Sequence, residues 1–325
     1  RFTYDFAAAQ PALALVARGF LPTLLGLAIT QVNTLVDSGV AWLLSATPGG
    51  TEQVPWLPEG IDYPMRQGAT AAIYYGERMY QFPLGVLGIA VATVIFPRLN
   101  RHAARHDHAR LADDLTTGLR LVLLMGIPAS AGLVLLAEPI ARLLFQHGEF
   151  TAADAARTAR MISIYGVSVW AYCAIPVLLR GYYAIGDRLT PVRLGLRLVA
   201  GNFLLNALLI WPLAEAGLAA STALVAAIQA TALAAILGRR LSLATRRLRG
   251  TLAHTAAATA VMTATGWLTL TMLEPADGLA SRLIRVGLPF VASSAAFFAA
   301  LWVLGRGEFS ILTSSDDGAD ERQPV

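Results

Sequence analysis

The sequence predicts an all-α membrane protein, a polytopic helical bundle of about eight transmembrane helices. Hydrophobic residues make up 56% of the 325 residues and charged residues only 14%, against roughly 25% charged residues in soluble domains. Apolar runs long enough to cross a bilayer recur along most of the chain. The basic residues, all of them arginine, gather in alternate connections between these runs, as they do in membrane proteins of fixed orientation.

The composition also excludes several other classes. A net charge of +4 could suggest a nucleic-acid partner, but the arginines lie between apolar runs, so we expect no nucleic acid. The single cysteine, Cys173, excludes an internal disulfide and a cysteine-based metal site. The chain begins at Arg1 with neither a methionine nor a signal-peptide pattern. We therefore expect it to be a segment of a longer protein.

The apolar runs define the expected elements in order. The eight spans fall at 19–46, 69–96, 114–137, 158–181, 192–212, 217–238, 252–273 and 283–304. Residues 1–18 are expected to form an amphipathic lead-in, and the polar, acidic residues 305–325 a disordered cytoplasmic tail. Pro128 and Pro176 lie inside spans and predict kinks.

The arginines predict the orientation of the bundle. Connections 97–112, 182–191 and 239–251 are arginine-rich, and the connections between them are not. The positive-inside rule places the arginine-rich connections in the cytoplasm, so 239–251 is expected to be a basic cytoplasmic loop. Both termini then lie in the cytoplasm, and the number of spans is even.

The second span carries charge inside an apolar run. Glu77 and Arg78 lie in its first half, although an arginine at a helix centre costs roughly 2.5–3.5 kcal/mol on insertion scales. Such residues mark a bundle interior or a watery pathway. Pro83, followed by two glycines, predicts a kink with close helix contact. Pro97 is expected to end the span at the basic connection.

Asp37 belongs to the first span, on a small and polar helical face. Because the first two spans form a hairpin, Asp37 and Arg78 should lie at similar depth, ~14 Å below the outer surface. One reading is a structural ion pair between the helices. The other is a guanidinium that grips an anionic group in a cavity, since guanidinium binds phosphate oxygens bidentately. Gln81 continues the Arg78 face.

A second polar set lies in the fifth and sixth spans. Asn202 and Asn206 are one helical turn apart, and Thr222 starts the next span at a similar depth. Together with Asp37 they offer oxygen ligands suited to a hard monovalent cation. Interhelical hydrogen bonds would use the same residues, and the spacing alone does not choose between these readings.

Other motifs carry little function. Three histidines in the basic connection, His102, His106 and His108, are expected on a solvated face and not in a metal site. The arginines of 239–249 could bind anionic lipid head groups, although their topology signal already explains them. The sequence has no Walker loop, nucleophile elbow or zinc motif, which disfavours an ATP-driven pump.

Three collinear stretches resemble one family. They are YYGERMYQFPLGVLGIAVATVIFPRLNRHAA from Tyr74, LLFQHGEFTAADAARTA from Leu143 and GYYAIGDRLTPV from Gly181. These motifs are similar to those of the MurJ (MviN) lipid II flippases, within the multidrug/oligosaccharidyl-lipid/polysaccharide exporter superfamily. The resemblance extends to about residue 304 and corresponds to the C-terminal part of the family's fold.

The resemblance implies half of a fourteen-helix, two-lobe exporter. Residues 19–238 would form the second six-helix lobe, and 252–304 an extra two-helix hairpin that frames a groove for the polyprenyl tail. The N-terminal lobe is missing from the chain and would be a partner. Arg78, with Glu77 and Gln81, would contact the pyrophosphate of the head group.

The resemblance also implies a sodium site at a set of four residues: Asp37, Asn202, Asn206 and Thr222. Two departures from the family pattern stand out. Gly76-Glu77 replaces the more usual Ala-Asp before the arginine, and Asn206 stands where a sodium-binding member has a carboxylate. The second departure weakens the charge argument for sodium, the only cofactor expected.

The expected function is to flip lipid II across the bacterial cytoplasmic membrane by alternating access. This movement changes no covalent bond, so we expect a transporter and not an enzyme. Its partners would be lipid II and membrane lipids. Three alternatives stay open: an exporter of drugs or of another polyprenyl-linked saccharide, an enzyme of polyprenyl-phosphate chemistry, and a non-transporting membrane scaffold. The extra hairpin argues against a twelve-helix drug exporter, and the depth of Asp37 and Glu77 argues against the enzyme.

Overall fold

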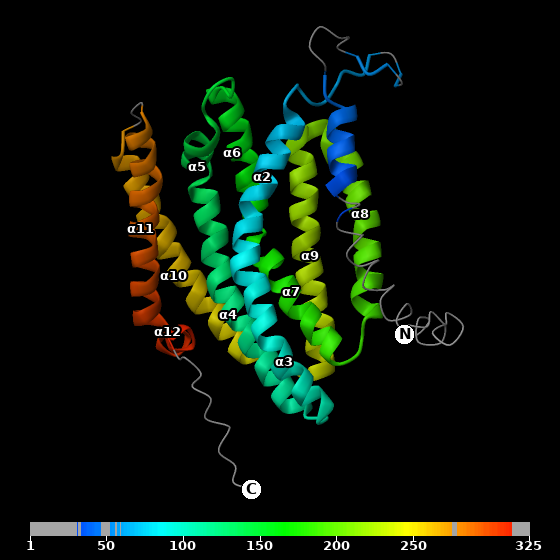
Figure 1. Cartoon of the computed structure of the whole chain (residues 1–325), viewed down its shortest axis with the longest axis vertical. Helices are drawn as coiled ribbons and strands as arrows, with labels where there is room; N and C mark the ends of the chain where they lie inside the picture. The colour runs from blue at the N-terminus through cyan, green and yellow to red at the C-terminus, as the bar shows by residue number, and fades with distance from the viewer. Residues whose placement is uncertain are drawn as a thin grey trace, which may run out of the picture.

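A computed structural model describes residues 31, 34–46, 53–55, 57–58, 60–274 and 278–313. The expected lead-in at 1–18 and much of the first expected span lie outside the described residues. Within them, every regular element is a helix, apart from two isolated bridges in the connection before α2 (Figure 1). The predicted all-α class is confirmed.

The second expected span is one continuous helix of 36 residues. It consists of α2 (Ala69–Pro83), the π-helix η1 (Leu84–Ile89) and α3 (Ala90–Ala104). Pro83 has no N–H to donate, and the helix widens into a π turn directly after it. The prediction that Pro97 ends the span is wrong, because α3 continues through Pro97. One proline removes one backbone hydrogen bond, a loss that membrane helices tolerate.

The next elements are α4 (His108–Leu135), α5 (Ala137–Phe145), α6 (Ala152–Gly166) and α7 (Val169–Ala184). Helices α6 and α7 occupy the fourth expected span but bend by 42° between them. The bend falls near Ser168 and not at Pro176, which lies inside α7. Ser168 Oγ donates to the carbonyl of Ala223 at 2.8 Å, and the Trp170 N–H donates to Ser130 Oγ at 3.0 Å. These long-range hydrogen bonds support the break.

The remaining helices are α8 (Leu189–Leu213), α9 (Glu215–Leu241), α10 (Thr245–Met272), α11 (Leu279–Leu304) and α12 (Arg306–Thr313). Two expectations need correction. The segment 239–251 is helical except for 242–244, since one left-handed residue, Ser242, suffices to end α9. In the expected tail 305–325, the first residues form α12, and residues after Thr313 lie outside the described part.

Five described helices are long and apolar enough to cross a membrane, or six if the bent pair α6–α7 is one span. The number is below the expected eight for two reasons. The first span is only partly described, and the 28 residues of α10 include many threonines. Large apolar side chains remain uncovered on the outside of the bundle, for example Leu204 at 63% exposure and Phe290 at 60%. Membrane-length helices with an apolar outer surface are typical of a multi-pass membrane protein.

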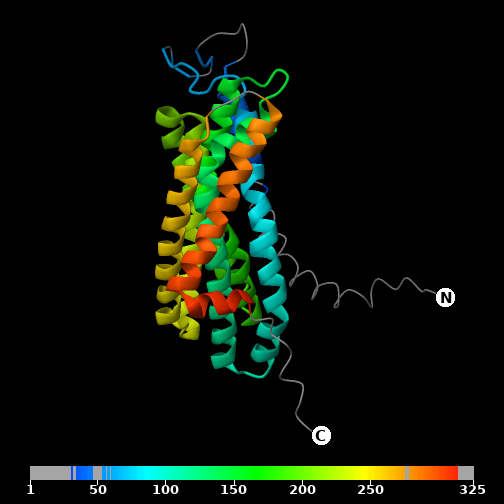
Figure 2. The same ribbon diagram turned by 90° about the vertical axis from the view of Figure 1, so that its left-hand side faces the viewer.

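The described helices stand side by side in one elongated bundle (Figure 1). Its core lies where α2, α4, α7 and α9 meet, around fully buried side chains such as Leu115 and Tyr182. Helices α10 and α11 form a hairpin at one edge, and α8 lies at the opposite edge (Figure 1). Helix α12 turns away from the end of α11 and lies across the lower part of the bundle (Figure 2). The arginine-rich turns α3–α4, α7–α8 and α9–α10 all lie at this lower end (Figure 1).

Candidate functional site

Arg78 lies on α2 with its guanidinium on an exposed face. Two neighbours on the same helix hold the guanidinium. Arg78 Nη1 donates to Gln81 Oε1 at 2.6 Å, and the guanidinium carbon lies 4.7 Å from the centre of the Tyr74 ring. Such a cation–π contact is favourable at short range. Arg78 is therefore oriented by α2 itself.

Glu77 also contacts Gln81 but forms no ion pair with Arg78. Its Oε1 accepts hydrogen bonds from Gln81 Nε2 at 3.3 Å and from Tyr80 Oη at 3.4 Å. Gln81 thus bridges the two charged neighbours, its oxygen on Arg78 and its nitrogen on Glu77. The three predicted head-group residues form one connected unit.

The structural ion pair between Asp37 and Arg78, one of the two readings of the sequence, does not form. Within the described residues, Arg78 has no carboxylate at ion-pair distance, and Asp37 accepts hydrogen bonds from α8 and α9. Asp37 and Glu77 do lie within electrostatic range of each other, in keeping with their predicted similar depth. The Arg78 charge is left available to an anionic group.

The exposed face of the long helix continues beyond Arg78. Phe82, Val86, Ile89 and Val94 are between 50% and 75% exposed. This face combines one oriented cation with large apolar side chains, and no described helix covers it. It could hold a ligand that has an anionic head next to an apolar chain.

The second predicted set, the polar residues of the fifth and sixth expected spans with Asp37, does lie together in the structure. Asn206 Nδ2 donates to Asp37 Oδ1 at 2.7 Å and to Asn202 Oδ1 at 3.0 Å, and Thr222 Oγ1 donates to Asp37 Oδ2 at 3.0 Å. Asp37, Asn202 and Asn206 are all buried. The set joins the helix at 34–43 to α8 and α9. We call it the polar clamp.

Sequence reasoning missed one member of the polar clamp. Ser221 is fully buried, its hydroxyl contacts Asn206 Oδ1, and it lies 3.5 Å from Asn202 Nδ2. The only signal in the sequence is its position next to Thr222 in an otherwise apolar run. With Ser221, five side chains from three helices share the hydrogen bonds.

The oxygens of the polar clamp suit sodium in kind, as carboxylate, amide and hydroxyl groups. The orientation of Asn206 does not, because its amide nitrogen lies between Asp37 Oδ1 and Asn202 Oδ1. Bound sodium would require this amide to turn its oxygen inward. No group of three or more His, Cys, Asp or Glu side chains in the described residues could hold a metal ion.

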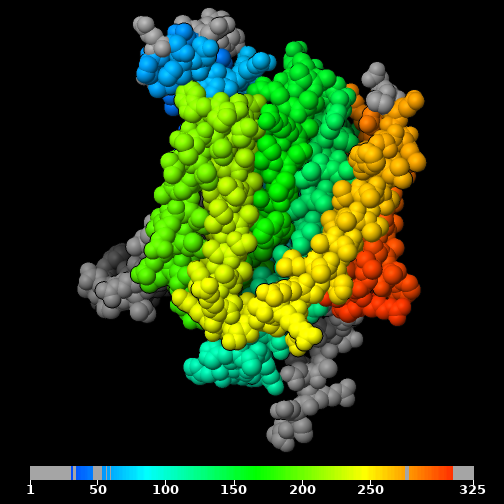
Figure 3. Space-filling model, turned by 180° about the vertical axis from the view of Figure 1, so that it is seen from behind, coloured from blue at the N-terminus to red at the C-terminus, as the bar shows by residue number. Residues whose placement is uncertain are grey.

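Two apolar hollows lie along the seam between α4 and α10. One cavity of about 610 Å³ is lined by Ile127 and Leu135 of α4 and by α10 from Ala256 to Trp267. The second, of about 430 Å³, adds Ser130 of α4 and Trp170 of α7. Helix α10 is seen beside α4 and α7 in Figure 3. Both hollows are open grooves on the outside of the bundle.

The sequence comparisons with known proteins identify one family. A family model described as "Lipid II flippase MurJ" matches residues 1–286. A curated protein of Vibrio cholerae, "Probable lipid II flippase MurJ", is 35% identical over 66% of this chain and 37% of its own length. A Rhizobium meliloti protein with the same description is 31% identical over 84% of this chain and 52% of its own length.

A solved structure, "Lipid II flippase MurJ, inward closed conformation", superposes with a TM-score of 0.69. The superposition covers 94% of this chain and 57% of that one, at 19% identity, so it shows the fold. The chain spans about half the length of the relatives it matches, or less.

Proposed function

Because the chain belongs to the MurJ family of lipid II flippases, we propose that it forms the C-terminal part of a transporter that moves lipid II across the bacterial cytoplasmic membrane. The single observation that carries this proposal is Arg78, a guanidinium held by Gln81 and Tyr74 on an apolar, uncovered helix face without an ionic partner among the described residues. A guanidinium binds phosphate oxygens bidentately, which suits a pyrophosphate.

The chemistry of the face supports a lipid-linked substrate. Arg78 would bind the pyrophosphate, with Glu77 and Gln81 fixing its direction, while Phe82 and the apolar residues beyond it meet less polar parts of the head group. An N-terminal lobe would cover this face and complete a cavity. No side chain here needs to make or break a covalent bond, so the activity is transport.

The α10–α11 hairpin supports a place for the polyprenyl tail. The hollows between α4 and α10 are lined by alanine, leucine, isoleucine and tryptophan, with a few hydroxyl groups. Such walls suit a hydrocarbon chain, which makes no hydrogen bonds and gains from apolar contact. The hairpin would hold the tail in lipid while the head crosses the cavity.

For the polar clamp we propose a closed, hydrogen-bonded state that joins the helix at 34–43 to α8 and α9. Sodium binding by Asp37, Asn202, Asn206 and Thr222, with Ser221, is a second candidate, supported by five converging oxygen-bearing side chains. A sodium titration of the stability of the full-length protein separates the two candidates. A rise in melting temperature with sodium but not with potassium would favour the ion.

For the orientation we propose that the lower end of the bundle in Figure 1 faces the cytoplasm. The arginines of the three lower turns support this, since positive charge stays on the cytoplasmic side. A reporter enzyme that works only in the cytoplasm should then be active when inserted at 242–244. A reporter enzyme that works only outside the cytoplasm should be active when inserted at 275–277.

Translocation of lipid II by the full-length protein in vesicles tests the proposed function. Arg78→Ala should abolish translocation, because the pyrophosphate loses its charged ligand, and membrane insertion should be intact. Arg110→Ala is the matched control, since it removes an arginine that pairs with Asp107 at the exposed lower end. Normal translocation by Arg78→Ala would refute the substrate-binding role.

A further inference from the structure

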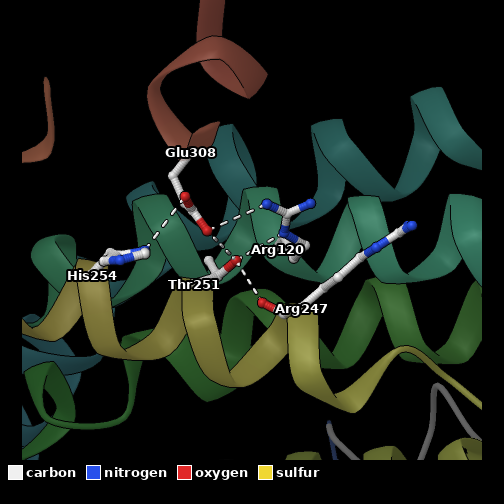
Figure 4. A network of polar contacts seen from close by, with 5 residues as sticks. All are labelled: Arg120, Arg247, Thr251, His254 and Glu308. Carbon is white, nitrogen blue, oxygen red and sulfur yellow. Dashed lines mark hydrogen bonds and ion pairs between the residues drawn. The ribbon is translucent and has the colours of Figure 1, made fainter. Parts of the chain in front are cut away.

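A buried charge network at the lower end of the bundle takes no part in the site described above. Its centre is Glu308 of α12, which is only 7% exposed. Glu308 Oε1 accepts hydrogen bonds from Arg120 Nη2 at 3.3 Å and Thr251 Oγ1 at 3.2 Å, and Oε2 lies 3.5 Å from His254 Nδ1. Figure 4 shows these side chains converging.

The network joins three helices through one carboxylate. Arg120 belongs to α4, Thr251 and His254 belong to α10, and Glu308 comes from α12. Arg120 Nε also donates to Thr251 Oγ1 at 2.8 Å. A buried carboxylate is costly unless it is paired and hydrogen-bonded. Glu308 therefore stays buried only while α12 remains against both α4 and α10.

Helix α12 depends on contacts with the rest of the bundle. It has eight residues, far fewer than an isolated helix needs to be stable in water. One residue, Gly305, separates it from α11, and the backbone there passes close to His254. Phe309 packs against a small cluster that includes Leu124 and Met262. This apolar contact and the charge network both hold α12 against the bundle.

The α10–α11 hairpin has a second polar tie at its opposite end. Arg282, at the start of α11, donates to the carbonyls of Arg142 at 3.3 Å and Gln146 at 2.7 Å. These carbonyls lie at the C-terminal end of α5, where a cation is favoured. Between the two ties lies the seam of α4 and α10 with its two hollows. Between its two ties the hairpin packs on α4 through the buried side chains of Leu124, Ala258 and Met262, with two open hollows along the seam.

We propose that α12 is a releasable strap, in which Glu308 fastens the lower end of the α10–α11 hairpin to Arg120 of α4. Release of the strap lets this end of the hairpin move away from α4 and widens the seam, while Arg282 holds the other end. The strap itself depends only on contacts within this chain. Its purpose, admitting a lipid chain to the seam, rests on the proposed function.

Hydrogen exchange of the full-length protein in lipid nanodiscs tests the strap. Glu308→Gln should speed amide exchange in α12 and in the first turns of α10 by about tenfold or more, because Arg120 loses its charged partner. The matched control is Glu138→Gln, which removes a carboxylate from the exposed Arg142–Glu138 pair within α5. Arg120→Gln should act like Glu308→Gln if the latter folds poorly. Unchanged exchange in both network variants would overturn the strap.

A reversible crosslink tests whether the strap must open. Thr251→Cys and Glu308→Cys, combined with Cys173→Ser, place one thiol on α10 and one on α12, which a short bis-methanethiosulfonate reagent can join. The crosslink should stop lipid II translocation, and a reductant that cleaves it should restore translocation. Full translocation with the crosslink in place would contradict a releasable strap. If the exchange results hold while the unmodified protein translocates no lipid II, the strap stands and the proposed function fails.

Discussion

At the scale of single residues, the site depends on how Arg78 is held. Gln81 gives its oxygen to Arg78 and its nitrogen to Glu77, so the amide keeps two opposite charges apart. Tyr74 covers one side of the guanidinium. The result is a cation whose direction is fixed but whose charge is not neutralised by a described neighbour.

Replacing Gln81 tests this arrangement. Gln81→Glu should place a carboxylate 3 residues from Arg78, where the amide oxygen now accepts at 2.6 Å, and neutralise the guanidinium. We expect translocation at low lipid II to fall by about tenfold, equivalent to ~1.4 kcal/mol. Gln81→Met, which keeps the length and adds no charge, should cost less. An equal loss in both variants would contradict a special need for an unpaired Arg78.

The sequence identified most of the polar residues but not their mutual contacts. Asn202 and Asn206 could be placed on one face from their spacing, and their approach to Asp37 is found in the structure. Ser221 could not be singled out, because a serine in an apolar helix usually bonds to its own backbone. The direction of the Asn206 amide depends on hydrogen bonds from three helices, so spacing within one helix does not reveal it.

At the scale of helices, the lengths of the apolar runs predicted where the helices lie. The prolines predicted poorly where those helices bend or end. The run 192–212 became α8 (Leu189–Leu213), with three residues added at its start and one at its end. Pro97 and Pro176 did not break their helices, whereas the chain bends near Ser168. Proline acts locally and is visible in a sequence. The bend depends on Ser130 and Ala223 from other helices, which no local pattern reveals.

The π-helix η1 packs tightly on α7 at a glycine. A Cβ at Gly88 would lie 2.8 Å from Cys173 Cα and 3.0 Å from its carbonyl oxygen, both backbone atoms, whereas a Cβ at Gly85 would meet nothing within 4 Å. Gly88→Ala should therefore destabilise the protein by about 1–3 kcal/mol. Gly85→Ala should be neutral or stabilising by about 0.5–1 kcal/mol. Thermal unfolding in one detergent compares them, and similar shifts would contradict the close approach.

The turn between α7 and α8 predicts a pH dependence. Burial opposes ionisation of Asp187, but hydrogen bonds from Thr190 and Arg240 outweigh it and hold the pKa of Asp187 below its ordinary value of 3.8. A lowered pKa stabilises the folded state above pH 3.8, and this contribution is lost as the pH falls through the folded-state pKa. Asp187→Asn should lower the melting temperature at pH 7.

The difference between the wild type and Asp187→Asn should shrink as the pH falls below about 3.8, where the unfolded carboxyl also takes up a proton. Melting temperatures measured from pH 7 to pH 3 check this. A constant difference would show that the Arg240–Asp187 pair does not act through charge.

At the scale of the whole molecule, no described helix covers two separate surfaces. One is the face of the long helix around Arg78, and the other is the seam beside the α10–α11 hairpin. Under the proposed function, the first would receive an anionic head and the second a hydrocarbon chain. The chain spans about half the length of its relatives, and in the proposed transporter an N-terminal lobe would cover the first surface.

The most direct measurement is the water accessibility of the helix face beside Arg78 in the membrane. In the full-length protein with Cys173→Ser, Phe82→Cys lies one helical turn from Arg78 on the same face, where Phe82 is 75% exposed. This cysteine should react with a membrane-impermeant thiol reagent, and lipid II should slow the reaction, because Arg78 is still present to bind the head group. Phe290→Cys, on the apolar and 60% exposed surface of α11, should not react. A cysteine at 82 that is as unreactive as one at 290, or that reacts at the same rate with and without lipid II, would contradict a hydrated chamber that receives the phosphorylated head.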